Sequence, residues 1–217
     1  MKKLAMFDLD GTLADTIESI ASATNMVLEQ LGLCPIETEK YNYFAGDGAS
    51  MLVKRALIAA GDKELRHFEE ANRAYQEFFK TNCTYKVRLF DGMKETLDSM
   101  KAKGMKLTVL TNKPHERAVE VIEFLFGKGY MDGIIGDQVG LRRKPEIDGA
   151  MRLMERFQVT PEECIYVGDT NVDMMTGKHA KMFTIGVLWG FRTREELEEH
   201  QADAIISKPE ELLEYIF

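Results

Sequence analysis

Short apolar runs alternate with segments of helical periodicity along most of the chain. The first run, Leu4–Leu9, has the length of a strand, and residues 17–31 then carry apolar side chains at helical spacing up to Gly32. Further strand-length apolar runs, separated by helical patterns, are found at residues 105–111, 133–137, 164–169, 182–188 and 202–206. This alternation predicts right-handed βαβ units and therefore a parallel sheet.

Residues 15–86 follow a different pattern, because they contain helical stretches at 17–31, 49–60 and 64–80 and no clear strand. The run at 4–9 cannot bury its faces alone, so it must join the sheet that the later strands form. We therefore predict an α/β fold in which a Rossmann-like parallel-sheet core is interrupted by a helical insertion. The core comprises residues 1–14 and 87–217, and the insertion comprises residues 15–86.

The composition narrows the class of partner. The 217 residues are 45% hydrophobic and 29% charged, and the net charge of −8 argues against a nucleic-acid partner held on a broad basic surface. No apolar run approaches the ~18 residues of a membrane span, and the apolar residues before Asp8 are too few for a signal peptide. Three cysteines without a CxxC pair fit free thiols in a reducing compartment. We expect a cytoplasmic protein with no nucleic-acid or membrane partner, either a monomer or a dimer.

Polar and charged residues follow several of the predicted strands. Asp8 and Asp10 end the first, Thr111 ends the second, and Asp169 ends the run at 164–169. Ligands of open parallel sheets bind beyond the carboxyl ends of the strands, so these residues should lie together. Neighbouring carboxylates repel unless a positive charge offsets them. Lys144 and a bound Mg²⁺ would supply that charge.

The spacing of the acids suits phosphoryl chemistry. Asp8 and Asp10 are two apart and face the same way, Gly11 allows a sharp turn, and Thr12 can donate to an anion. One carboxylate can attack phosphorus while a second protonates the leaving oxygen and then activates water. A general acid contributes roughly 10²–10⁴-fold, far below the up to ~10²¹-fold that phosphate monoester hydrolysis needs. The remainder requires metal and charge neutralisation, for which suitable groups are Thr111, Asn112 and Lys144.

These residues resemble the motifs of the haloacid dehalogenase superfamily, on its phosphatase branch. The motif DxDGT stands here as Asp8–Thr12, and the Thr that follows a strand is Thr111 in "VLTNK". The motif lysine is best matched by Lys144 in "RRKPEI", and GDxxxD stands as Gly168–Asp173. The four motifs occur in the family's order, and the resemblance covers the whole chain.

The resemblance implies that Asp8 is a nucleophile and Asp10 a general acid and base. It implies that Thr111 and Lys144 hold the phosphoryl oxygens and that the helical insertion is a cap domain over the site. A Mg²⁺ ion would be held by Asp8, Asp10 through its main-chain carbonyl, Asp169 and Asp173.

Within this superfamily, "FAGDGASMLVKRAL" (44–57) and "LTNKP" (110–114) look most like phosphoglycolate phosphatases. Gly46 and Gly48 would reach toward the leaving group, although they also fit a plain turn. A small carboxylated substrate would need a cation, and candidates are Lys54, Arg55 and Lys113. The first two of these also fit a solvated helix face.

The resemblance thus favours a Mg²⁺-dependent phosphatase that hydrolyses a small phosphorylated metabolite, 2-phosphoglycolate, through an aspartyl phosphate. Two departures leave the substrate open: Ile147 replaces a frequent second proline, and residues 90–92 read Phe-Asp-Gly where Pro-Gly is usual. The alternatives are a pyrophosphatase or nucleotidase, or a phosphomutase similar to β-phosphoglucomutase. A phospho-acceptor signalling module is a further alternative, but such a module needs no insertion.

Overall fold

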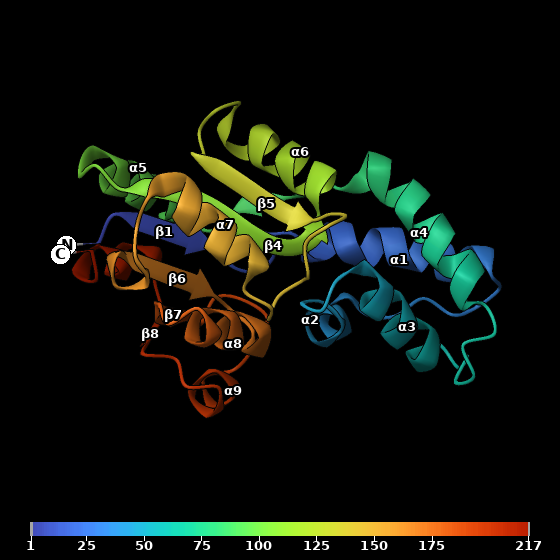
Figure 1. Ribbon diagram of the computed structural model, residues 1–217. Coiled ribbons are helices and arrows are strands. Elements are labelled where there is room, and N and C mark those ends of the chain that lie inside the picture. The colour runs from blue at the N-terminus through green and yellow to red at the C-terminus, as the bar shows by residue number, and fades with distance from the viewer. Residues whose placement is uncertain (1, 217) are drawn as a thin grey trace.

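The computed structural model describes residues 2–216 and is built around a six-stranded parallel sheet in the order β5-β4-β1-β6-β7-β8 (Figure 1). The strands are β1 (Leu4–Phe7), β4 (Lys106–Pro114), β5 (Gly133–Asp137), β6 (Cys164–Gly168), β7 (Phe183–Val187) and β8 (Ala204–Ile206). Each neighbouring pair is parallel. The predicted α/β class with a parallel sheet is confirmed.

β1 lies at the centre of the sheet, where Leu4 is in register with Lys106 on one side and Cys164 on the other. Its side chains alternate between two apolar layers and are all buried, with Phe7 on one face and Met6 on the other. The Phe7 face is covered by α5 (Met93–Ala102) and α6 (His115–Phe126). The Met6 face is covered by α7 (Asp148–Phe157) and α8 (Asn171–His179).

Between β1 and β4 the chain forms a group of helices that pack on one another. They are α1 (Ile17–Gln30), η1 (Thr38–Lys40), α2 (Tyr41–Phe44), α3 (Ala49–Ala59) and α4 (Phe68–Asn82). Figure 1 shows these helices beyond the arrowheads of the strands, at the edge where the carboxyl ends lie. Val27, Leu57 and Phe79 fill the space between them. Any ligand at that edge of the sheet would therefore lie between the sheet and the helices.

A short antiparallel pair joins the two chain segments that connect the helices to the sheet. It consists of β2 (Ala14–Asp15) and β3 (Arg88–Leu89), and an ion pair of 2.9 Å between the Arg88 guanidinium and the Asp15 carboxylate reinforces it. The hydrophobic pattern did not predict β2, because two residues are too few to show alternation. The pairing holds the entry and exit of the helical segment side by side.

Some element boundaries differ from the prediction. α4 begins at Phe68 rather than at 64, because the Asp62 carboxylate accepts hydrogen bonds from the backbone N–H groups of Arg66 and His67 and holds a turn there. The predicted C-terminal helix is the 3-10 helix η3 (Pro209–Glu214), whereas α9 (Arg194–Glu199) forms as expected. Among residues 2–216, no helix is both long and apolar enough to cross a membrane.

The packing of α5 against the sheet gives a test of the core. Met100 on α5 is fully buried (0% exposed), whereas Met151 on α7 is 41% exposed. We expect Met100→Ala to lower the free energy of unfolding by about 2–5 kcal/mol, because the substitution leaves a cavity in a packed layer. Met151→Ala should change it by about 0.5 kcal/mol or less. Urea unfolding of both variants measures the difference, and equal effects would contradict this packing.

Candidate active site

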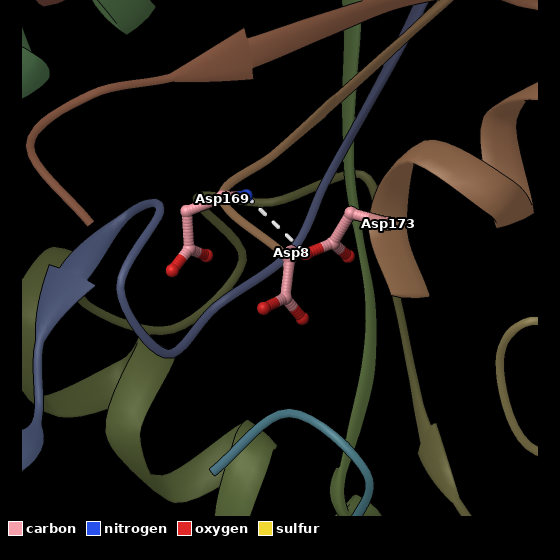
Figure 2. A group of neighbouring side chains, drawn as sticks. All are labelled: Asp8, Asp169 and Asp173. Carbon is pink, nitrogen blue, oxygen red and sulfur yellow. Dashed lines mark hydrogen bonds between the residues drawn. The ribbon is translucent and has the colours of Figure 1, made fainter. Parts of the chain in front are cut away.

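Three aspartates converge at the carboxyl ends of the central strands. Asp8 follows β1, Asp169 follows β6, and Asp173 lies in the first turn of α8. Because β1 and β6 are parallel neighbours, their ends are adjacent. Each buried carboxylate offers an oxygen within 4.8 Å of the others. Figure 2 shows the Asp8 and Asp169 carboxylates pointing the same way, while Asp173 reaches them from its helix.

Asp173 is fully engaged by protein donors. Its Oδ2 accepts hydrogen bonds from the backbone N–H groups of Asp169 and Thr170 and from the Thr170 hydroxyl. Its Oδ1 accepts from the Lys144 ammonium at 2.7 Å and from the Tyr166 hydroxyl at 3.2 Å. With two donors or more on each oxygen, Asp173 is placed to fix the geometry of its neighbours.

Lys144 supplies the positive charge inside this cluster. Its Nζ lies 2.7 Å from both Asp8 Oδ1 and Asp173 Oδ1, and its side chain is 3% exposed. Burial lowers the pKa of Lys144, but the carboxylates of Asp173 and Asp8 outweigh burial and raise it well above the ordinary value. The lysine therefore remains an ammonium ion at physiological pH.

Asp169 sits in a cradle of glycines. Its Oδ1 accepts from the Thr12 hydroxyl at 2.7 Å and its Oδ2 from the Phe191 N–H at 2.8 Å. A Cβ at Gly11 would lie 2.3 Å from Asp169 Oδ2, and one at Gly190 would lie 2.3 Å from the Asp169 Cβ. The φ of Gly11 is also +86°, a conformation that suits glycine. Only residues without a side chain leave room for this carboxylate.

The cluster carries more negative than positive charge. Burial raises the pKa of Asp8 to about 6, helped by Asp173 and Asp10 and opposed by Lys144. Burial also raises the pKa of Asp169 well above its ordinary value, with contributions from Asp173 and Asp8. Buried acids of this kind mark functional sites. Hard oxygen donors beside one another fit a divalent cation such as Mg²⁺, whose charge would restore the balance.

A cavity of about 40 Å³ lies above Asp8 and Asp10, between the end of β4 and the helices. Thr111, Asn112 and Lys113 line it, and so do Gly46 and Gly48 from the loop before α3. The structure thus brings most of the sequence-predicted site residues together.

Asn112 uses both ends of its amide on the backbone. Its Nδ2 donates to the carbonyl oxygens of Gly46 and Lys144, at 3.0 and 3.1 Å, and its Oδ1 accepts from the Lys144 N–H at 2.9 Å. This side chain was expected to contact the substrate. In the structure its amide ties the Lys144 loop to the Gly46 loop, and the residue also lines the cavity.

Three other residues lie differently from the expectation. The Thr12 hydroxyl donates to Asp169 rather than toward an anion. The Lys54 ammonium lies over the ring of Phe68, 4.8 Å from its centroid. Arg55 pairs with the carboxylate of Asp47 at 2.5 Å and donates to the Phe44 carbonyl at 2.9 Å. Neither cation lines the cavity above Asp8, because each is held by a neighbour within the helical segment.

The loop after β7 contributes contacts that the sequence analysis did not identify. The Trp189 indole donates to the Thr12 carbonyl at 2.9 Å, and the Phe191 N–H binds Asp169. The Arg192 guanidinium donates to the carbonyl oxygens of Asn42 and Ala45, the latter at 3.0 Å. Each of these bonds has a backbone group as donor or acceptor, and a backbone partner leaves no signature in the residue types.

Comparison with known proteins agrees with this arrangement. The profile of the haloacid dehalogenase-like hydrolases matches residues 5–187, so the chain belongs to this family. Within the family it is a phosphoric monoester hydrolase similar to the phosphoglycolate phosphatases. The phosphoglycolate phosphatase of Aquifex aeolicus is 29% identical over 97% of this chain and 95% of its own length.

Solved structures show the same relationship. An inferred phosphoglycolate phosphatase from Lactobacillus delbrueckii subsp. bulgaricus is 32% identical, with a TM-score of 0.91 over 100% of this chain and 99% of its own. A β-phosphoglucomutase from Clostridium difficile shares the fold, with a TM-score of 0.79 at 20% identity over 100% of this chain and 96% of its own. The sequence-based assignment to the superfamily is confirmed.

The raised pKa of Asp8 predicts a pH-dependent stability in the absence of metal. The pKa is about 6 in the folded protein against an ordinary value of 3.8. The protonated carboxyl therefore stabilises the fold below about pH 4, and this contribution is lost as the pH rises through 6. Asp8→Asn cannot ionise. Relative to wild type, its free energy of unfolding should rise by a few kcal/mol between pH 4 and 7, at about 1.4 kcal/mol per pKa unit.

Urea unfolding in EDTA at pH 4, 5, 6 and 7 measures this difference. Groups that do not interact with Asp8 titrate alike in both proteins and cancel in the comparison. A difference that stays constant across this range would contradict the proposed electrostatics of Asp8.

Proposed function

We propose that the protein is a Mg²⁺-dependent phosphatase that hydrolyses 2-phosphoglycolate through a phosphorylated Asp8. The observation that carries the proposal is the state of the Asp8 carboxylate, which lies in the cavity with Oδ1 bound to Lys144. Within the described residues 2–216, no donor binds its Oδ2. A carboxylate held by one oxygen and open at the other suits a nucleophile.

In the first step, an Asp8 oxygen forms a bond to phosphorus and the ester P–O bond breaks. Asp10 gives its proton to the departing oxygen. The resulting Asp10 carboxylate then accepts a proton from a water molecule that attacks the phosphorus and releases Asp8. Lys113 Nζ lies 2.7 Å from Asp10 Oδ1, which supports the proposed pair of acids because this contact holds the Asp10 carboxyl at the cavity that Asp8 also lines.

Lys144 and Thr111 would hold the phosphoryl oxygens, since both lie beside Asp8 at the end of the sheet. Mg²⁺ would be held by Asp8, Asp169 and the main-chain carbonyl of Asp10, with Asp173 in support, and when bound it neutralises phosphoryl charge. The oxygen-only donor set and the excess of negative charge support this choice of ion.

We propose that residues 15–86 act as a cap domain on a core of residues 1–14 and 87–217. The paired strands β2 and β3 at the junction, together with the contacts of Asn112 and Arg192 to the loop that contains Gly46, support this division. A closed cap would exclude water from the first step and thereby favour transfer to Asp8.

The substrate assignment is supported by the names of the relatives. The net charge of −8 also supports a small-molecule partner rather than nucleic acid. We also propose that the protein is located in the cytoplasm.

We expect 2-phosphoglycolate to exceed other phosphoesters by about 100-fold in kcat/KM, which corresponds to ~2.7 kcal/mol of discrimination. The measurement is phosphate release with Mg²⁺ from 2-phosphoglycolate, pyrophosphate, nucleoside monophosphates and sugar phosphates. EDTA should abolish the activity, and Asp8→Asn should remove it by at least 10⁴-fold because no nucleophile remains.

The alternatives give other results in the same assay. A pyrophosphatase or nucleotidase would prefer a different member of the panel. A phosphomutase would convert a sugar phosphate without stoichiometric phosphate release, and a signalling module would remain phosphorylated without turnover. Each of these outcomes would replace 2-phosphoglycolate hydrolysis as the function.

Asp10→Asn tests the acid and base roles separately. We expect kcat for 2-phosphoglycolate to fall by roughly 10²–10⁴-fold, because the leaving alkoxide would depart without a proton. With p-nitrophenyl phosphate, whose leaving group needs no proton, the variant should still phosphorylate Asp8 in a rapid burst and then stall at hydrolysis. Rapid-quench measurement of p-nitrophenol resolves the two phases, and an unchanged steady-state rate would exclude Asp10 from the chemistry.

A further inference from the structure

Tyr75, on α4, is a largely buried tyrosine at the cavity above Asp8. The residue is 3% exposed, it lines the cavity above Asp8, and its ring stacks on that of Phe79 with 5.1 Å between centroids. Within residues 2–216, its hydroxyl makes no hydrogen bond. Among residues 2–216, Thr16 Oγ1 is the one fully enclosed side-chain polar atom without a partner, so the Tyr75 hydroxyl keeps some exposure and is available to a molecule in the cavity.

The other deeply buried tyrosines do not share this property. The hydroxyl of Tyr41 donates to Asn25 Oδ1 at 2.7 Å, and that of Tyr166 donates to Asp173 at 3.2 Å. The two partnered tyrosines show what the fold does where a hydroxyl is enclosed by protein. Burial and the nearby Asp10 raise the pKa of Tyr75 well above its ordinary value, and the phenol therefore remains a donor.

A cation stands beside the same aromatic pair. The Lys113 ammonium lies over the Phe79 ring, 4.7 Å from its centroid, and its side chain is 2% exposed. Ile20 and Leu52 line the same cavity, and the Asp10 carboxylate pairs with the Lys113 ammonium. The ammonium and the phenol are two donors at one cavity, and such a pair is suited to one small anionic group.

We propose that the Tyr75 hydroxyl, together with Lys113, binds the carboxylate of the substrate and so selects carboxylated phosphoesters. This inference rests on the proposed function and adds the residue that determines its substrate class. The phosphoryl group lies at Asp8, and the carboxylate of a two-carbon leaving group points toward α4. A neutral leaving group of the same size would leave the hydroxyl unpaired, which is the means by which a polar site rejects an analogue.

The test compares 2-phosphoglycolate with ethyl phosphate, which has the same length and no carboxylate. Binding of each ester is measured by calorimetry with Mg²⁺ in the non-hydrolysing Asp8→Asn protein, with and without Tyr75→Phe. We expect Tyr75→Phe to weaken the binding of 2-phosphoglycolate by at least tenfold, because the substitution removes a hydrogen bond to a charged group. The affinity for ethyl phosphate should change by less than about twofold.

Tyr41→Phe is the matched control, because it removes a hydroxyl from a buried tyrosine of the same helical segment. It should lower the melting temperature through the lost bond to Asn25 and leave both affinities unchanged, whereas Tyr75→Phe should leave the melting temperature unchanged. In the active enzyme, Tyr75→Phe should reduce kcat/KM for 2-phosphoglycolate and spare that for ethyl phosphate.

The outcomes separate this inference from the proposed function. If Tyr75→Phe weakens the binding of both esters equally, or of neither, the role of Tyr75 is overturned. The preference of the parent protein for 2-phosphoglycolate would still stand. A parent protein that binds ethyl phosphate as tightly as 2-phosphoglycolate would overturn the carboxylated substrate itself, and with it the inference.

Discussion

The site depends on one buried ammonium group between two carboxylates. Lys144 lies 2.7 Å from Asp8 and from Asp173, and without it these buried carboxylates would lie close together with no counter-charge. Other contacts act through this lysine: Asn112 fixes its backbone, and Tyr166 binds the oxygen of Asp173 that the lysine also binds. The single positive charge of Lys144 does not balance the three carboxylates. The site is therefore suited to bind a cation first and then a phosphate group.

Much of this arrangement could be predicted because it follows from strand geometry. Parallel strands end at one edge, so Asp8, Thr111 and Asp169 had to lie near one another once their strands were assigned. The start of α4 could not be predicted in the same way, because it is set by the side chain of Asp62. The pairing of β2 with β3 is too short to leave a periodic signal.

The cations of the helical segment show a second limit of prediction from the sequence. Lys54 and Arg55 have the right charge, but local partners hold them away from the cavity. Tyr75 is the opposite case, because its position in a helical pattern predicts only a core residue. Its distinguishing property is a missing hydrogen bond, which depends on everything that surrounds it in three dimensions. Residue type and spacing therefore identify the reacting acids better than the groups that select the substrate.

The central place of β1 has a consequence for how the protein is made. Its partners in the sheet begin at Lys106 and Cys164, so β1 gains its first neighbour in the sheet only after the intervening helices and Lys106–Pro114 have been synthesised. The helices between can associate earlier, because their contacts are closer in sequence. A chain that ends before Cys164 lacks Asp169 and Asp173, and therefore has no assembled centre with which to act on phosphoesters.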